Sequence, residues 1–136
     1  MNRRTEVARF GSVRWAVVDD GRPIFAQIAE QIENSIIDGS LAEDAQVPST
    51  NELAAFHRIN PATAAKGINE LVDEGILYKK RGIGMFVTPG ARAKLLQRRR
   101  EQFADRYLRP LLAEAHKLGL TSAELKDMIE TSQENR

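Results

Sequence analysis

Thr63, Lys66 and the run Lys79, Lys80, Arg81 are the side chains with the clearest potential for chemistry, and that chemistry is recognition of a nucleic acid. A threonine hydroxyl can donate or accept a hydrogen bond, and its methyl group can contact the methyl group of thymine. A lysine can reach a phosphate or a guanine, and a lysine or arginine on a hairpin can enter a minor groove. These residues are therefore candidate DNA contacts.

Residues for catalysis or metal binding show no such pattern. The sequence has no cysteine, which excludes disulfides, thiolate zinc sites and a cysteine nucleophile. Its two histidines, His57 and His116, have no carboxylate or nucleophile at a suggestive spacing, and there is no phosphate loop, HExxH motif or serine elbow. We expect both histidines to be solvated or to cap a helix. We also expect no enzyme activity, no metal site and no cofactor.

The composition is that of a globular protein, with 136 residues of which 42% are hydrophobic and 29% charged. No apolar run approaches the roughly 18 to 20 residues of a membrane helix, and we find no secretory signal, so we expect a cytoplasmic protein without membrane contact. The net charge of +1 is unevenly spread: −4 in residues 1–56, +7 in residues 57–100 and −2 in residues 101–136. The basic middle third suits a polyanion partner, although a solvated basic surface would have the same composition.

Three helices are predicted to position these residues. The first contains Phe25, Ile28, Ile32 and Ile36 at the period of an amphipathic helix, and Gly39 ends it. We expect its apolar side to face a core.

The second and third helices are predicted from their N-terminal capping signals. Ser49 and Glu52 form a capping box, and Asn60 is an N-cap followed by Pro61 at the first helical position. Two short helices joined by a tight turn indicate a helix-turn-helix, whose second helix enters the major groove. Its inner face would hold Ala64, Ile68, Leu71 and Val72, and its outer face Ala62, Thr63, Lys66 and Asn69. Gly67 suits close crossing by a neighbouring helix, and a plain three-helix bundle is the alternative.

The segment "ILYKKRGIGMFV" predicts a strand, a Gly-Ile-Gly turn and a second strand, which together form a β-hairpin. Its predicted tip consists of Lys79, Lys80, Arg81 and Gly82. A basic hairpin directly after a helix-turn-helix is the wing of a winged helix, where a glycine allows close approach to DNA. A solvated basic tip is the alternative.

The stretch from Pro23 to Val87 resembles the DNA-binding domain of GntR-family bacterial transcription regulators. The matching segments are "PIFAQI", "DGSL", "VPSTNELA" and the wing "ILYKKRGIGMFV", in the family's order and spacing. Within the family, "INPATAAKGINEL" is similar to the Asn-Pro-x-Thr version of the YtrA-like subfamily, whose members are short and lack a large effector domain. The resemblance implies a winged helix and regulation of transcription, often of neighbouring transport operons.

The resemblance also implies DNA contacts at Ser49, Thr63, Lys66, Arg81 and Gly82. Two departures change the expected base readout. Asn51 stands where relatives commonly have arginine, and Ala64, Ala65 and Lys66 stand where many have Val-Arg or Val-Ser-Arg. An amide prefers adenine, whereas an arginine prefers guanine. The resemblance therefore does not imply that this chain reads the family's usual operator sequence. The full set of expected DNA-binding residues is Ser49, Asn51, Asn60, Ala62, Thr63, Lys66, Lys79, Lys80, Arg81 and Gly82.

The segment after Val87 predicts a long helix that Pro110 kinks or splits near Arg106, and then a last helix with a capping box at Thr121 and Glu124. Two helices cannot enclose a sizeable ligand cavity and bury their own apolar stripe as well. We therefore expect dimerisation, as the subfamily resemblance also implies; folding back onto the winged helix is the alternative. The expected dimerisation residues are Leu96, Phe103, Tyr107, Leu111, Leu112, Leu118, Leu125 and Met128.

Together these features predict a mainly α-helical fold with a small β-hairpin. Residues 1–12 are a candidate disordered leader, residues 13–88 a winged helix-turn-helix domain, and residues 91–136 a two-helix dimerisation hairpin. Trp15 and Val17 would pack a leader strand onto the helices. The expected function is a homodimeric, sequence-specific regulator, a repressor on a pseudo-palindromic double-stranded operator. A protein-interaction module and a non-specific architectural DNA binder are the alternatives. A small-molecule effector would bind between the subunits, or the protein has none.

Overall fold

The structure of the protein, a computed structural model, describes residues 7–10 and 13–16 by their backbone and residues 21–135 in full. The chain divides into two compact units, residues 1–96 (the N-terminal unit) and residues 97–136 (the C-terminal unit). The boundary falls inside one helix, α4 (Ala91–Phe103).

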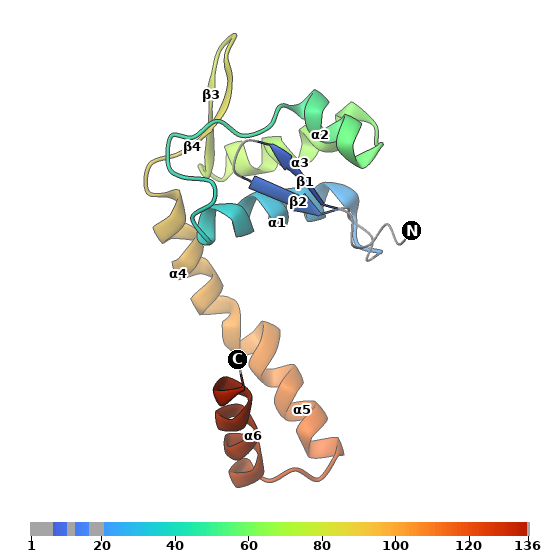
Figure 1. Cartoon of the computed structure of the whole chain (residues 1–136), viewed down its shortest axis with the longest axis vertical. Coiled ribbons are helices and arrows are strands. Elements are labelled where there is room, and N and C mark those ends of the chain that lie inside the picture. The colour runs from blue at the N-terminus through green and yellow to red at the C-terminus, as the bar shows by residue number, and fades with distance from the viewer. Residues whose placement is uncertain (1–6, 11–12, 17–20, 136) are drawn as a thin grey trace. The chain divides into compact units, whose positions relative to one another are not determined.

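The N-terminal unit is a helical layer with two β-hairpins (Figure 1). The strands of the second hairpin run antiparallel, with Leu77 opposite Val87 and Lys80 opposite Gly84. In chain order the elements are β1 (Val7–Phe10), β2 (Val13–Ala16), α1 (Ile24–Ile37), α2 (Thr50–His57), α3 (Pro61–Asp73), β3 (Leu77–Lys80), β4 (Gly84–Val87) and the start of α4. The predicted winged helix-turn-helix is therefore present.

Strand β1 lies inside the segment expected to be a disordered leader. Residues 7–10 pair with β2 in an antiparallel ladder, Val7 opposite Ala16 and Phe10 opposite Val13. At these four residues the structure differs from the expectation, because the backbone groups of β1 have a partner strand. The rest of the leader and the expected packing of Trp15 and Val17 lie outside the described residues and side chains.

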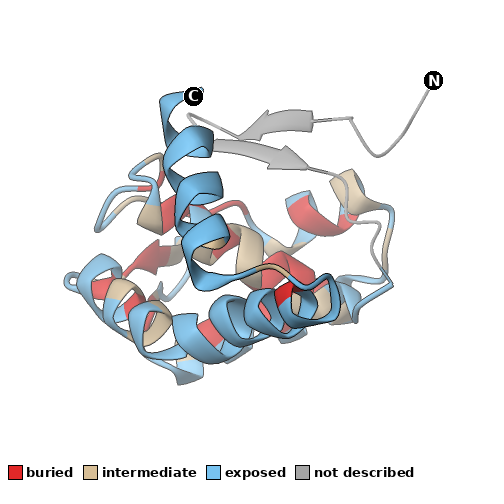
Figure 2. Cartoon of the chain, turned by 90° about the horizontal axis from the view of Figure 1, so that it is seen from below, coloured by how far each residue is buried: buried red, intermediate tan, exposed pale blue. Residues whose placement is uncertain are grey.

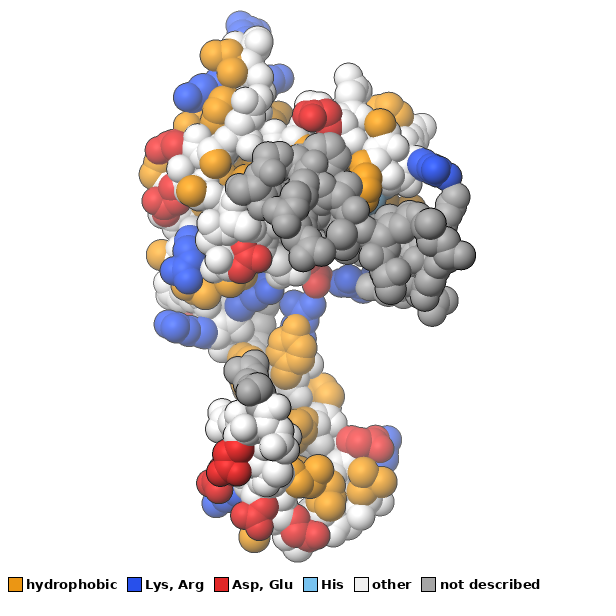
Figure 3. Space-filling model, viewed as in Figure 1, with side chains coloured by type: hydrophobic (Ala, Val, Ile, Leu, Met, Phe, Trp, Pro, Cys, Tyr) orange, Lys and Arg blue, Asp and Glu red, His pale blue; other side chains and the backbone are white. Residues whose placement is uncertain are grey.

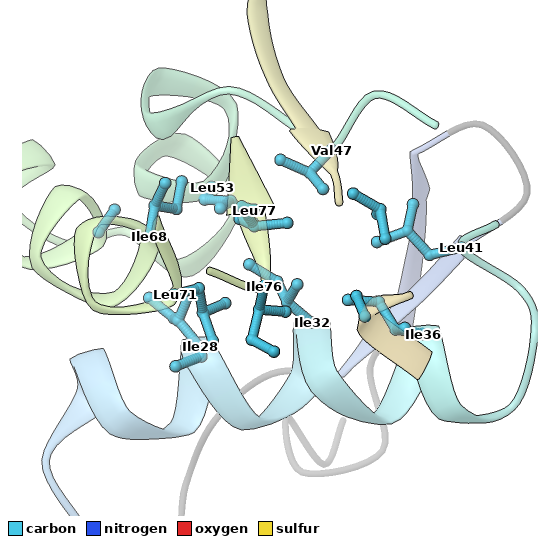
Figure 4. Close-up of a cluster of buried hydrophobic side chains, with 14 of the residues drawn as sticks. Ile28, Ile32, Ile36, Leu41, Val47, Leu53, Ile68, Leu71, Ile76 and Leu77 are labelled. Carbon is cyan, nitrogen blue, oxygen red and sulfur yellow. The ribbon is translucent and has the colours of Figure 1, made fainter. Parts of the chain in front are cut away.

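The core of the N-terminal unit forms where the apolar faces of α1 and α3 meet. Figure 4 shows Ile28, Ile32 and Ile36 pointing from one side of α1 toward Leu71 and the other core side chains. This confirms the predicted period of the first helix, because residues three or four apart lie on one face. The other buried members include Leu41, Val47, Leu53, Ala64, Ile68, Ile76, Leu77, Val87, Ala91 and Leu95.

An isolated antiparallel bridge between Gln46 and Phe86 joins the segment before α2 to the wing, and the sequence did not predict it. The Val47 amide donates to the Met85 carbonyl (2.9 Å), and the Val87 amide donates to the Ala45 carbonyl (3.0 Å). Residues 45–47 therefore pair with one edge of β4 and tie the wing to the segment before α2. Three residues next to a proline carry too little periodicity to predict this pairing.

The C-terminal unit consists of the end of α4, a π-helical turn η2 (Ala104–Leu108), α5 (Arg109–Lys117) and α6 (Ser122–Glu134). The π-helical turn contains Arg106 and ends two residues before Pro110, where the sequence predicted that the helix is disrupted. Proline has no N–H to donate to the carbonyl four residues earlier, and a wider turn accommodates that loss. The capping box at Thr121 and Glu124 is present at the start of α6, with N–H to O distances of 3.0 and 3.1 Å.

Candidate nucleic-acid interface

The helix-turn-helix is held by local hydrogen bonds at each helix start. The Glu52 amide donates to the Ser49 hydroxyl oxygen (3.1 Å), and the Ser49 amide donates to the Glu52 carboxylate (2.9 Å). At α3 the Ala62 amide donates to the Asn60 side-chain oxygen (2.8 Å), with Pro61 at the first helical position. These caps confirm the predicted helix starts. They leave the Ser49 hydroxyl proton and the Asn60 side-chain NH₂ group available as donors.

Helix α3 has one buried face and one face of small and polar residues. Ala64, Ile68 and Leu71 are at most 1% exposed, as predicted for the inner face. Val72, also predicted there, is half-buried. On the other side Thr63 is half-buried and Ala62, Lys66 and Asn69 are exposed. Asn51 is exposed in the first turn of α2. The exposed face of α3 therefore combines hydrogen-bonding groups with little steric bulk.

The backbones of α1 and α3 approach each other closely at Gly67. A Cβ atom at this position would lie 2.6 Å from the Phe25 backbone oxygen, closer than real Cβ atoms come to neighbours. The glycine is thus required by the crossing of two backbones, which is the condition under which the sequence made a mid-helix glycine acceptable. Beside this crossing, the Lys66 ammonium lies 4.0 Å from the centre of the Phe25 ring.

The wing differs from the prediction in what stands at its tip. Lys79 and Lys80 belong to strand β3, and the turn consists of Arg81, Gly82 and Ile83, all exposed. The strand period places the two lysines on opposite faces of the hairpin, so they cannot both project from its end. Lys and Arg side chains gather over this hairpin at the top of Figure 3.

The tip backbone is braced by Gln46, the residue that bridges to Phe86. Its side-chain NH₂ group donates to the Ile83 carbonyl (3.1 Å), and a Cβ atom at Gly84 would lie 2.6 Å from that nitrogen. Gly84 also has a φ of +148°, a backbone angle that residues other than glycine rarely adopt. The second glycine of the Gly-Ile-Gly turn therefore makes room for the brace.

Aromatic rings support one face of the wing. Tyr78 and Phe86 are opposite each other across the hairpin and stack with ring centroids 5.9 Å apart. The Lys80 ammonium lies 4.3 Å from the Phe86 ring centre. The Tyr78 hydroxyl donates to the Asp44 carboxylate (2.8 Å), and this hydrogen bond, with burial and the nearby negative charge, raises the pKa of Tyr78 above 10.0.

His57 is not the solvated or capping residue that the sequence suggested. It ends α2, is half-buried, and meets the Phe56 ring edge-on at a centroid distance of 4.8 Å. Both ring nitrogens are buried without a hydrogen-bond partner among the described residues, and burial lowers the pKa of His57 below 6.5. Packing around the end of α2 decided this environment. His116 is exposed on α5.

No group of three His, Cys, Asp or Glu side chains in the described part of the chain is arranged to hold a metal ion. Within residues 7–10, 13–16 and 21–135, no helix has the length and apolar character needed to span a membrane.

The C-terminal unit exposes its apolar side chains. Among residues 97–135 only Ala115 is buried, and the helix that ends at the C-terminus is coloured as exposed along nearly its whole length in Figure 2. Leu125 is half-buried, and Leu96 is half-buried within the N-terminal unit. The exposed large apolar residues of this unit are Phe103, Tyr107, Leu108, Leu111, Leu112, Leu118, Met128 and Ile129, of which Leu108 and Ile129 were not among the expected dimerisation residues.

An open hollow of about 440 Å³ lies between α5 and α6, lined by Leu111, Leu125, Met128, Ile129, Ser132 and Gln133. It is open, which agrees with the expectation that two helices cannot enclose a sizeable ligand cavity. The hollow exists because two helices alone cannot cover the apolar faces that they turn toward each other.

Comparison with known proteins places this arrangement among DNA-binding regulators. Residues 24–87 match the family described as "Bacterial regulatory proteins, gntR family". The chain is 30% identical over 107 residues to the HTH-type transcriptional repressor YtrA of Bacillus subtilis, an alignment that covers 79% of this chain and 82% of the repressor.

Solved structures show the same similarity. A transcriptional regulator of the GntR family from Bacteroides thetaiotaomicron superposes with a TM-score of 0.65 at 31% identity, over 83% of this chain and 99% of the other. AraR(DBD), solved in complex with operator ORX1, has a TM-score of 0.50 at 33% identity, over 53% of this chain and 94% of the other. The relatives are transcription regulators, which are not enzymes, in agreement with the sequence prediction.

Proposed function

The chain belongs to the GntR family of bacterial regulatory proteins, as a DNA-binding regulator similar to YtrA, and from this premise we propose that it is a dimeric repressor of a pseudo-palindromic operator. Double-stranded DNA and a second copy of the chain are its partners, and it acts in the cytoplasm. A two-fold dimer would present two copies of α3 to successive major grooves, about 34 Å apart.

The exposed face of α3 carries the proposal. Thr63, Lys66 and Asn51 contact bases in the major groove. Asn60 and Ala62 bring the start of α3 close to the DNA backbone and the bases. The Ser49 hydroxyl contributes a further hydrogen bond. The observation that supports it most is that Ala64, Ile68 and Leu71 bury one face of α3, while the opposite face holds only small or hydrogen-bonding side chains. A relative of similar fold was solved with its operator, which supports this assignment.

We assign minor-groove contact to the wing. Arg81 and Gly82 are exposed in the turn, and Lys79 and Lys80 supply positive charge from the strand below it. The hydrogen bond from Gln46 to the Ile83 carbonyl orders the tip before binding, so less conformational entropy is lost on contact.

Dimerisation is assigned to the C-terminal unit. Eight large apolar side chains on α4, η2, α5 and its C-cap residue, and α6 are at least 44% exposed, and Figure 3 shows apolar atoms gathered on the visible face of this unit. A contiguous apolar surface of this kind marks an interaction site, because water contact with it is unfavourable. A second copy would cover this surface with its own. The dimerisation residues of the proposal are Phe103, Tyr107, Leu111, Leu112, Leu118, Leu125 and Met128 of this unit, together with Leu96, the last residue of the N-terminal unit. An effector would bind between the subunits.

The testing experiment is fluorescence anisotropy on the DNA upstream of the protein's own gene and on a scrambled duplex, at two salt concentrations. We expect a preference for the native duplex of roughly a thousandfold. Thr63→Ala should remove much of this preference, whereas Arg81→Ala should weaken binding to both duplexes and lower the salt slope by about 0.9.

Two exposed residues of α6 provide matched controls: Thr131→Ala for the threonine and Lys126→Ala for the cation. Neither should change DNA binding. Equal affinity for both duplexes would identify an architectural DNA binder. Undetectable binding would overturn the proposal and point to a protein partner for the same surface.

A further inference from the structure

We infer that Phe25 is a positioning residue for DNA recognition, which acts by holding the Lys66 ammonium at the exposed face of α3. This inference rests on the proposed function, since it takes Lys66 to be a DNA contact. Phe25 itself would contribute through its ring face and make no base contact.

The contact joins two elements that the core already fixes. The Lys66 ammonium lies 4.0 Å from the centre of the Phe25 ring, within the range of a cation–π interaction. Phe25 belongs to the first turn of α1 and is half-buried, whereas Lys66 is exposed in the second turn of α3. The ring is thus partly covered by the fold, whereas Lys66 keeps exposed surface.

The crossing at Gly67 fixes the position of the Phe25 backbone, from which the ring extends. A Cβ atom at Gly67 would lie only 2.6 Å from the Phe25 carbonyl oxygen. Neither backbone can shift without opening this contact, and the buried Ile28 side chain reaches the same point at 3.5 Å. The first turn of α1 therefore presents the Phe25 ring to the residue beside Gly67, which is Lys66.

A carboxylate is available to Lys66 but is not used. Glu70 follows Lys66 by four residues on α3, a spacing that commonly forms a surface ion pair. No ion pair joins these two residues, and the ammonium lies over the Phe25 ring instead. The ring leaves the positive charge uncompensated, so the charge stays available to a phosphate or a guanine.

The physical benefit is preorganisation. A free lysine side chain loses up to about 2 kcal/mol of rotamer entropy when it is ordered. A lysine that already rests on a ring has lost part of that freedom before DNA arrives, so binding is more favourable. The ring also fixes which base pair the ammonium reaches. Phe25 would therefore affect both affinity and base preference.

The decisive experiment keeps the shape of the ring and changes only its electrons. Phe25 is replaced by 4-fluoro-, 3,5-difluoro- and 3,4,5-trifluorophenylalanine in the full chain, and affinity for the native duplex is measured by anisotropy. Each fluorine weakens the attraction of a cation to the ring face. We expect affinity to fall with each added fluorine, by about three- to tenfold in total, and we expect Phe25→Leu, which has no ring, to give the lowest affinity of the series.

The same series is repeated with Lys66→Met, which keeps the length of the side chain but removes its charge. In this background the fluorinated variants should all bind equally. Ile24→Ala, a neighbour in the same helical turn, controls for lost apolar surface, and thermal unfolding of every variant controls for stability.

The outcomes separate the two levels of the argument. If Lys66→Met leaves affinity and base preference unchanged, Lys66 is not a DNA contact, and that part of the proposed function fails. If Lys66→Met weakens binding but fluorination has no effect, or has the same effect with and without the lysine, the positioning role of Phe25 is overturned.

Discussion

The two units of this chain treat their apolar residues in opposite ways. In the N-terminal unit the large apolar side chains of α1, α3 and the wing converge on one core, and Ile28, Ile32 and Leu53 have no exposed surface. In the C-terminal unit, Phe103, Leu118 and their neighbours are about half exposed, and of its described residues only an alanine is buried.

This difference shows that two units with equally well-formed helices can differ in whether they are stable without a partner. Both units contain well-formed helices, and each has a capping box with nearly the same hydrogen-bond lengths. Helix caps contribute about 1 kcal/mol each, whereas burial of one large apolar side chain contributes about 1.5–3 kcal/mol. We therefore expect the N-terminal unit to be stable by itself and the C-terminal unit to depend on its partner copy.

The largest expected effect comes from breaking the partnership of the C-terminal unit. Leu111→Asp places a charge on the exposed apolar face and into the hollow between α5 and α6. We expect a monomer instead of a dimer in sedimentation, with an operator affinity reduced about a hundredfold or more, because two linked half-site contacts become one. Thr131→Asp, a control on α6, should remain dimeric. A dimeric Leu111→Asp protein would remove this face from the interface.

In the N-terminal unit the sharpest test of core packing is Gly67→Ala. In an exposed helix this change stabilises by roughly 1 kcal/mol, but here the new methyl group would meet the Phe25 carbonyl oxygen. We expect a net loss of about 1–3 kcal/mol in urea unfolding. Asn69→Ala, at an exposed position of the same helix, should be neutral or slightly stabilising. A more stable Gly67→Ala protein would mean that the two helices can separate at no cost.

The two capping boxes allow a matched comparison of the units. Ser49→Ala and Thr121→Ala each remove one side-chain acceptor from a helix start, so each should cost about 1 kcal/mol. The loss at Thr121 should depend on protein concentration, because folding of α6 is coupled to dimerisation, and the loss at Ser49 should not. Unfolding at two protein concentrations measures this. Identical concentration dependence for the two variants would contradict the comparison.

The smallest expected effects are two pH dependences in different ranges. Burial holds the folded-state pKa of His57 below 6.5. The neutral His57 side chain therefore contributes to the free energy of unfolding above pH 6.5, and this contribution is lost as pH falls through the folded-state pKa. Hydrogen bonds from the Thr121 amide and hydroxyl lower the pKa of Glu124 below 4.5, so its contribution is present above pH 4.5 and is lost at more acidic pH.

Unfolding curves between pH 3 and pH 8 should therefore show a first loss that His57→Gln removes and a second, more acidic loss that Glu124→Gln removes. The same pH profile for wild type and His57→Gln would show that the ring titrates as freely in the folded protein as in the unfolded chain.

Much of the fold could be predicted because it depends on neighbours in sequence. The Asn60–Pro61 and Ser49–Glu52 pairs start helices with side chains no more than three residues away, and all of these starts are confirmed. Pro110 disrupts its helix for an equally local reason, the missing N–H group. The positions of the α3 face and of the hairpin followed from these signals and from the residue period.

The wing tip was predicted less well. The run of basic residues suggested four tip residues, but β3 extends through Lys80, because its backbone pairs as far as Gly84. The end of a hairpin is decided by its register across two strands, which charge does not report.

The sequence by itself determined the helices, the wing hairpin, the buried face of α3 and the family resemblance, since each depends on residues a few positions apart. Only the tertiary structure decided the contacts between distant segments: residues 45–47 beside β4, Gln46 under the wing tip, the buried environment of His57, and Lys66 over Phe25. The physical reason is that these contacts follow from how whole elements cross. At Gly67 that crossing leaves no room for one methyl group, and it thereby sets the ring beside the lysine.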